Sequence, residues 1–175
     1  MKNQFAFILM LYTLLFSAQT YQFNYHFTFK EYPSNREYQD QAKVLTKLGS
    51  KGKLYEVSFG QDDEKYTPQV SENMVLPRSQ YQYTLYTEDG TSFLIHDFIQ
   101  KKYYDLEDHV HLDWHFTSET KMFQQVKLEK ATVDFRGRHY TAWFQKSSTF
   151  SVAPWKFSGL PGIVYEIYDD ENRFR

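Results

Sequence analysis

Apolar and polar residues alternate at every second position in two long runs of the chain. In the run FNYHFTFK at 23–30, the aromatic residues share one face of an extended strand and polar residues share the other. The run YQYTLYT at 81–87 leads through Glu88-Asp89-Gly90 into a return segment at 91–99. Gly90 suits a hairpin turn because glycine readily adopts positive φ. A period of two predicts strands with one buried face.

The rest of the pattern predicts further short strands separated by turns. The other predicted strands are 109–116, 126–135, 139–144 and 163–168, with a hairpin of 44–48 and 53–59 that contributes Leu54, Val57 and Phe59 to the core. The predicted connections are a break at 33–35, a loop at 60–80, a polar segment at 101–108, a turn or short helical start at 117–120 and a turn at 169–172; residues 36–42 remain undecided. The fold class is therefore mainly β, as a single antiparallel, strongly curved sheet or a partial barrel or sandwich, with little helix.

Residues 1–18 have the features of a secretory signal peptide. Lys2 supplies a positive charge, residues 5–16 are almost wholly apolar, and Ser17-Ala18 supplies small residues for cleavage. The apolar run is too short to span a bilayer comfortably, and a buried N-terminal helix is the alternative. We expect export to the periplasm, the outer membrane or the medium. Residues 19–175 are expected to form one β domain without a transmembrane segment.

Composition narrows the possible function classes. Aromatic residues make up 19% of the 175-residue chain, which favours β structure. The chain has no cysteine, so disulfides, thiol catalysis and thiolate metal sites are excluded. The formal net charge of −2 at pH 7 gives no indication of nucleic acid as a partner. Other cell-envelope proteins are the partner class that export allows.

Three of the six histidines follow one another at alternate positions. On a strand at 109–116, His109, His111 and His115 share one face with Asp113. Neighbours at i and i+2 lie roughly 7 Å apart, so two imidazoles could reach one zinc or copper ion. The simpler interpretation, which we favour, is that the histidines lie on the solvent-exposed face of a sheet whose other face belongs to the core. No cofactor or catalytic residue is predicted with a comparable pattern.

Two further groups could contact a ligand. Arg136 and Arg138 flank Gly137 at a hairpin tip and could hold an anion, although charges at such a turn are usually solvated. Trp155 and Phe157 could line a ligand groove, but aromatics beside a Pro-Gly turn are more often part of a core.

The segment before the last predicted strand reads as a rigid corner. Pro161-Gly162 fits the central positions of a type II turn, in which proline presets φ and glycine takes a positive φ. Leu160 precedes proline and is therefore expected to be extended. The last residues, 173–175, begin another predicted strand and stop, so we expect the sequence to be a fragment of a longer protein.

The corner also carries a family resemblance. The hexapeptide Gly159-Leu160-Pro161-Gly162-Ile163-Val164 resembles the signature of the GLPGLI family, whose members are exported proteins of Gram-negative Bacteroidota. The segments that also resemble the family are 113–114, 119–121, 135–144 and 154–157, so the match covers about residues 113–170. The departures are Ala153 in place of the family's usual glycine, Leu128 where many members have cysteine, and the absence of the usual Ile-Pro in 146–152.

The resemblance implies an exported, β-rich protein of undetermined function, and it assigns no catalytic residue. Family members usually continue past this point, which agrees with the expectation of a fragment. Three functions remain open. The first is a non-enzymatic envelope or secreted binding or structural module. The second is a zinc- or copper-binding protein that uses the histidine face, and the third is a periplasmic carrier of a lipid or small ligand.

Overall fold

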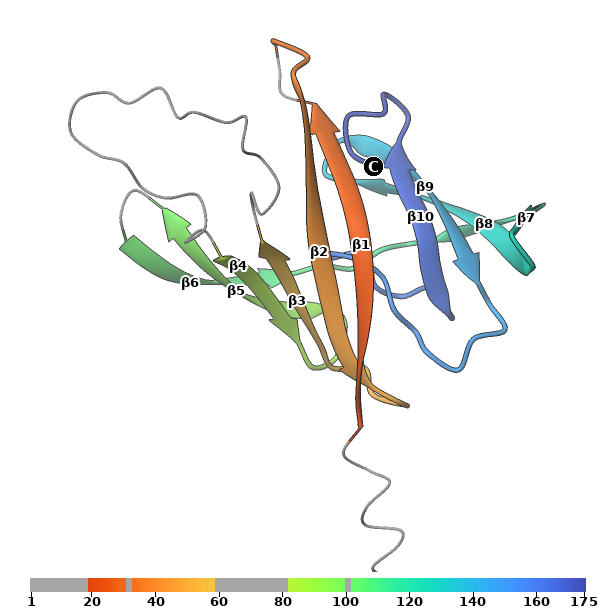
Figure 1. Ribbon diagram of the computed structural model, residues 1–175, viewed down its shortest axis with the longest axis horizontal. Helices are drawn as coiled ribbons and strands as arrows, with labels where there is room; N and C mark the ends of the chain where they lie inside the picture. Colours follow the sequence, from red (N-terminus) through yellow and green to blue (C-terminus); the bar gives the residue numbers. More distant parts are fainter. Residues whose placement is uncertain (1–18, 31–32, 59–81, 100–101) are drawn as a thin grey trace, which may run out of the picture.

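The computed structural model describes residues 19–30, 33–58, 82–99 and 102–175, and the predicted leader and the predicted 60–80 loop lie outside these ranges. Ten strands form two antiparallel sheets (Figure 1), and the described residues contain no helix. The prediction of a mainly β fold is therefore confirmed. The strands divide between two sheets, so the expectation of a single sheet is wrong. Among the described residues no helix is long and apolar enough to cross a membrane.

The first sheet has six strands in chain order, each paired with its neighbour in sequence. Its strands are β1 (Thr20–Lys30), β2 (Glu37–Lys47), β3 (Lys53–Ser58), β4 (Gln82–Thr87), β5 (Ser92–Ile99) and β6 (Lys102–His109). Burial along the first half of β1 alternates as the aromatic–polar pattern predicts. The predicted turn at Gly90 is also confirmed, because this glycine has a φ of +82°.

The second sheet has four strands in the order β10-β9-β8-β7. These are β7 (His115–Phe123), β8 (Val126–Phe135), β9 (Arg138–Gln145) and β10 (Ile163–Asp169). The predicted β8–β9 hairpin and the predicted strand 163–168 are confirmed. Gly137 has a φ of +77° in the hairpin turn, which is the conformation that favours glycine there.

Three sequence expectations are corrected by the structure, and one undecided segment is assigned. Residues 101–108 are not a connection, because nearly all of them belong to β6 and pair with β5. Residues 109–116 are not one strand, because the chain leaves the first sheet after His109 and enters the second at His115. Residues 117–120 lie within β7, where the register shifts between Phe116 and Thr120. The undecided segment 36–42 is largely strand, as the first half of β2.

The core expectation for the 53–59 strand is confirmed only at Val57. Lys53, Tyr55 and Val57 are buried at alternate positions, so Leu54 points to the other face and is half-buried. Phe59 lies outside the described residues.

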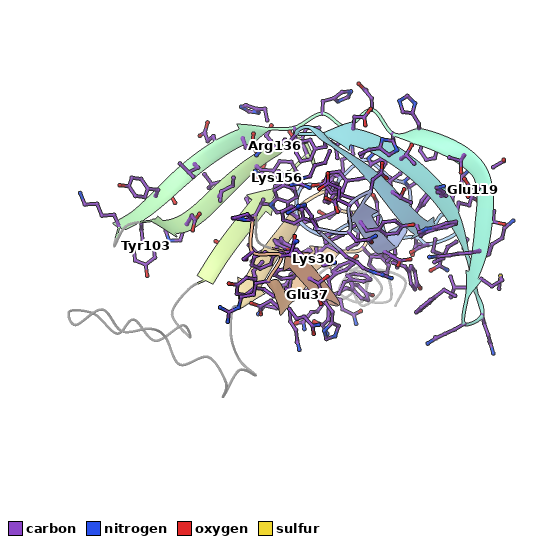
Figure 2. All side chains as sticks on the ribbon, turned by 90° about the horizontal axis from the view of Figure 1, so that it is seen from above. Lys30, Glu37, Tyr103, Glu119, Arg136 and Lys156 are labelled. Atoms are coloured by element: carbon purple, nitrogen blue, oxygen red, sulfur yellow. The ribbon has the colours of Figure 1, made fainter. Side chains whose placement is uncertain are left out.

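The two sheets have separate hydrophobic clusters that meet at their junction. One cluster is centred on Val44, Leu85 and Phe93 of the first sheet, and the other on Val133 and Phe144 of the second. The side chains that pack against both clusters are Leu112, Phe135 and Trp155. Figure 2 shows the sheets as two sides of an arch, with Tyr103 and Glu119 towards opposite ends and Arg136 and Lys156 near its top. The connection 110–114 thus joins the two sheets, with Val110 buried and Leu112 packed against both clusters.

Candidate ligand-binding cleft between the sheets

The space between β1 and β10 contains a cleft of about 750 Å³. Its walls come from segments far apart in sequence, namely β1, β3, the end of β7, the β8–β9 hairpin, the 154–157 corner, β10 and residues 174–175. Most of the lining is aromatic or aliphatic: Tyr25, Phe27, Tyr55, Val57, Phe123, Leu128, Phe135, Tyr140, Pro154, Trp155, Phe157, Val164, Tyr165, Ile167 and Phe174. Its volume and largely apolar lining are typical of small-ligand sites.

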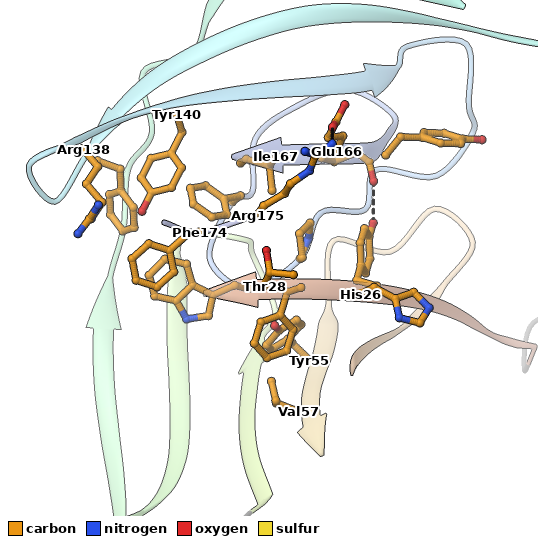
Figure 3. A pocket seen from close by; sticks show the side chains of 18 of the residues that line it. His26, Thr28, Tyr55, Val57, Arg138, Tyr140, Glu166, Ile167, Phe174 and Arg175 are labelled. Atoms are coloured by element: carbon orange, nitrogen blue, oxygen red, sulfur yellow. Dashed lines mark hydrogen bonds and ion pairs between the residues drawn. The ribbon is translucent and has the colours of Figure 1, made fainter. Parts of the chain in front are cut away.

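The two edge strands face each other across this cleft. In Figure 3, His26 and Thr28 on β1 lie opposite Glu166 and Ile167 on β10, with Phe174 and Arg175 between them. A direct hydrogen bond joins the strands: the Tyr25 hydroxyl donates to the Val164 carbonyl over 3.0 Å. Burial raises the pKa of the Tyr25 phenol, and the neighbouring phenols of Tyr165 and Tyr55 raise it further. Tyr25 therefore remains a neutral donor.

Packed aromatic rings form one wall of the cleft. Ring centroids of Phe157 lie 4.8 Å from Tyr140, 5.5 Å from Trp155 and 6.0 Å from Phe135. These edge-on and tilted arrangements are the favourable ones for aromatic pairs. Trp155 has a φ of +49°, a conformation that bulky residues rarely adopt. Strained backbone of this kind tends to occur at functional sites.

Trp155 and Phe157 were predicted either to line a ligand groove or to belong to a core, and each alternative is correct in part. Phe157 is buried in the second hydrophobic cluster and also lines the cleft, whereas Trp155 is half-buried and lines it too.

Ion pairs hold the charged residues around the cleft. Arg138 donates to Asp169 over 2.6 Å, and Asp169 is almost completely buried. Glu166 pairs with Lys121 and with Arg175. Partial burial raises the pKa of Glu166, but the two cationic partners outweigh it and hold this pKa below its ordinary value. Glu166 is therefore a carboxylate at neutral pH.

A second ionic group ties the two sheets together at Asp108, the second-last residue of β6. Its carboxylate pairs with Lys156 of the corner and with Arg136 of the β8–β9 turn. Burial raises the pKa of Asp108, but these two cations outweigh it and lower the pKa. Lys156 is only 4% exposed, so its ammonium depends on this partner. The two arginines that could have held an anion, Arg136 and Arg138, thus already have carboxylate partners.

The signature segment 159–164 forms a corner beside the cleft. Val152 forms a parallel bridge with Ile163: the Val152 N–H donates to the Gly162 carbonyl over 2.9 Å, and the Val164 N–H donates to the Val152 carbonyl over 2.8 Å. The Trp114 indole donates to the Ser158 carbonyl over 2.8 Å and lies against Gly159. The positive φ expected at Gly162 is confirmed at +102°. The corner supports the start of β10, and its Val164 also lines the cleft.

The three candidate metal ligands are not brought together. His109 ends β6, His111 lies in the connection and pairs with Asp113 at 3.1 Å, and His115 begins β7. All three are exposed. In the part of the chain that the structure describes, no three His, Asp or Glu residues are grouped as a metal site requires. The three histidines are exposed while Val110 is buried, as the simpler interpretation expects, but residues 110–114 are not a strand, so the three histidines do not share one strand face.

The residues that line the cleft were not predicted as ligand contacts, apart from the four candidates Arg136, Arg138, Trp155 and Phe157. The alternation in 23–30 correctly marked Tyr25 and Phe27 as lying on the inward face, but it does not say what they face. No sequence signal indicated Glu166 or Ile167 as neighbours of β1, since their proximity depends on how the two sheets pack.

Comparison with known proteins identifies no matching family model and no matching curated protein. Two solved structures of PNGF-II, in different crystal forms, are similar to this chain with TM-scores of 0.57 and 0.56 and 14% sequence identity each. The matches cover 90% and 87% of this chain but only 27% and 26% of the PNGF-II chain. This chain thus spans about a quarter of that protein's length. At such low identity the similarity establishes the fold alone.

Proposed function

We propose that this protein is an exported, non-enzymatic binding module whose ligand occupies the cleft between the two sheets. The observation that carries the proposal is the cleft of about 750 Å³ with its predominantly aromatic and aliphatic lining. An apolar ligand that leaves water for such a surface gains roughly 25 cal/mol per Å² of buried area. The cleft thus favours the binding and carrier functions over a purely structural one.

The charged groups support binding rather than catalysis. Arg138, Glu166 and Arg175 all line the cleft, and each is held in an ion pair. Their positions stabilise the sheets around the cleft and shape its rim. We further propose that the two sheets act as the halves of a partial sandwich, with the cleft along the open seam.

Export and family membership complete the proposal. The leader-like residues 1–18 support passage out of the cytoplasm, and the hexapeptide at 159–164 supports membership of the GLPGLI family. On this proposal, the module acts in the periplasm, at the outer membrane or outside the cell. The zinc or copper alternative has no supporting geometry among the described residues.

The test is binding of a neutral apolar probe, N-phenyl-1-naphthylamine, followed by its fluorescence increase. The variant Thr28→Trp places a large side chain at a residue that lines the cleft. It should weaken probe binding at least tenfold, equivalent to about 1.4 kcal/mol. The matched control is Thr120→Trp, at an exposed position of β7 outside the lining, which should bind as the wild type does.

Saturable binding that Thr28→Trp weakens and Thr120→Trp does not would support the proposal. A wild-type protein that fails to bind the probe, or equal binding by both variants, would show that the cleft is not the site.

A further inference from the structure

The turn between β2 and β3 carries three lysines within seven residues. Lys47 ends β2, Lys51 lies in the turn and Lys53 begins β3. Within the described residues none of the three forms an ion pair, whereas Lys43, further back on β2, pairs with Glu56 over 2.7 Å. The turn therefore carries a concentration of positive charge that no carboxylate of the described chain neutralises.

Lys53 differs from the other two because its side chain is buried. It is only 9% exposed and lies on the same strand face as the buried Tyr55 and Val57. Its ammonium reaches back to the exposed part of the turn, where it donates to the Lys51 carbonyl over 3.4 Å, a long and therefore weak hydrogen bond. Burial lowers the pKa of Lys53, since a charge taken out of water is costly without a counter-charge. An anion at this turn would supply that counter-charge.

The same turn exposes an apolar side chain. Leu48 directly follows Lys47 and is 57% exposed. A single exposed leucine is ordinary on a protein surface. This one is distinguished by its place in the turn, between the exposed, unpaired Lys47 and Lys51. Leucine and lysine side chains presented together are typical of segments that lie at the interface of a membrane.

The nearest acidic residues do not cancel this charge. Glu88 and Asp89 lie in the neighbouring β4–β5 turn, and a Cβ added to Gly52 would lie 3.9 Å from the Glu88 Cα. Both carboxylates accept hydrogen bonds within their own turn and strand end. Neither carboxylate raises the pKa of Lys53, which burial lowers. The positive charge of the β2–β3 turn is thus available to an external anion.

We propose that the β2–β3 turn docks on a membrane surface that contains anionic phospholipid. The lysines of the turn would lie at the lipid phosphates, and Leu48 would enter the boundary between headgroups and acyl chains. A free phosphate ion would satisfy the lysines but offers nothing to Leu48, so the exposed leucine favours the lipid. The inference goes beyond the cleft and does not depend on a ligand there.

The expected binding is weak and sensitive to salt. One lysine near an anionic membrane surface strengthens binding roughly fivefold, and this attraction falls off within a Debye length of about 8 Å at physiological ionic strength. Three lysines and one leucine therefore give reversible docking and not a permanent anchor.

The experiment measures co-sedimentation of the full chain with vesicles of phosphatidylglycerol or of phosphatidylcholine. Lys51→Gln and Leu48→Ser should each weaken binding to phosphatidylglycerol roughly fivefold. Lys53→Met keeps an apolar stem in the buried position, removes the charge and should have a similar effect. The matched control is Lys102→Gln. β6 runs in the same direction as β2, so Lys102 at its start is exposed at the opposite end of the sheet and its variant should bind as the wild type does.

A second measurement locates the contact. Residues 1–18 are present in every variant, so a difference between variants reports the turn and not the apolar leader. In NMR spectra recorded with phosphatidylglycerol nanodiscs that contain a paramagnetic lipid, the described amides that broaden most should be those of 47–52. Millimolar inorganic phosphate without lipid serves as the comparison for binding of a free anion.

Each outcome supports or overturns membrane docking. Weaker binding by the turn variants but not by Lys102→Gln, with broadening at 47–52, supports it. An equal loss in Lys102→Gln overturns it, because only the net charge would then matter. Absence of vesicle binding, or broadening centred elsewhere among the described residues, also overturns it. If inorganic phosphate shifts the signals of 47–53 and vesicles do not bind, the turn holds a free anion and membrane docking is wrong. Binding of N-phenyl-1-naphthylamine in the cleft is judged separately from all of these results.

Discussion

The corner at Gly162 allows a stability prediction that can be worked from geometry. Gly162 has a φ of +102°, and a Cβ added there would lie 2.0 Å from the Gln145 carbonyl oxygen and 2.8 Å from its carbonyl carbon. The variant Gly162→Ala therefore has two costs. An L-residue at positive φ costs about 1–2 kcal/mol. The overlap adds about 1–3 kcal/mol, because the obstacle is the backbone at the end of β9 and not a flexible side chain.

The expected loss in the free energy of unfolding is thus about 2–5 kcal/mol, a large share of the total stability of a typical domain. The control is Gly49→Ala, since Gly49 has a similar φ of +74° and nothing within 4 Å of an added Cβ. It should lose only the 1–2 kcal/mol of backbone strain. Gly162→Val should be at least as damaging as the alanine variant.

The assay is urea denaturation followed by circular dichroism. Where a variant has the same dependence of unfolding free energy on urea concentration as the wild type, the shift in its midpoint reports the change in stability. The difference between Gly162→Ala and Gly49→Ala isolates the overlap with Gln145. If the two variants lose the same amount, the close approach of the corner to β9 is refuted. If neither loses stability, the positive φ values are refuted as well.

Three other outcomes are expected. Asp108→Asn should lower the free energy of unfolding by about 3 kcal/mol in urea denaturation, because it leaves the buried Lys156 ammonium without its carboxylate. Arg136→Gln removes a more exposed partner of Asp108 and should cost under about 1 kcal/mol. Equal losses in the two variants would contradict the difference in burial between Lys156 and Arg136. Because the folded protein lowers the pKa of Glu166 below its ordinary 4.5, the stability from this group is present above that pH and is lost as the pH falls through the folded pKa. Glu166→Gln should therefore flatten the dependence of stability on pH below about 4.5, and an unchanged slope would argue against the ion pairs. Elemental analysis of untagged protein should find no stoichiometric zinc or copper, and metal that is lost in His111→Ala would revive the histidine site.

The hairpins could be predicted because their signals are local. Aromatic alternation in 23–30 and the glycine turns at Gly90 and Gly137 depend on residues close in sequence, and the structure places β1, β4–β5 and β8–β9 where these signals indicated. Prediction failed at β6 and β7, where nearly every residue is exposed. An edge strand without a buried face shows no apolar period, so these segments resembled a connection and a turn.

The prediction of a histidine metal site failed for a related reason. The alternation of His109, His111 and His115 has meaning only if one strand continues through all three, and the chain instead changes sheets between the first and the last. Burial of Val110 and the packing of Leu112 against both clusters decide that path. These contacts join residues distant in sequence, so no local pattern reports them.

By itself, the sequence determined the β class, most of the hairpins and the corner, because backbone preferences and period-two burial operate over a few residues. Only the tertiary structure decided that there are two sheets, that the edges of β1 and β10 face each other, and that an apolar cleft lies between them. The relative placement of the sheets follows from packing across the Leu112, Phe135 and Trp155 junction and from the ion pairs at Asp108. Such interactions depend on three-dimensional proximity, and the cleft exists only as their consequence.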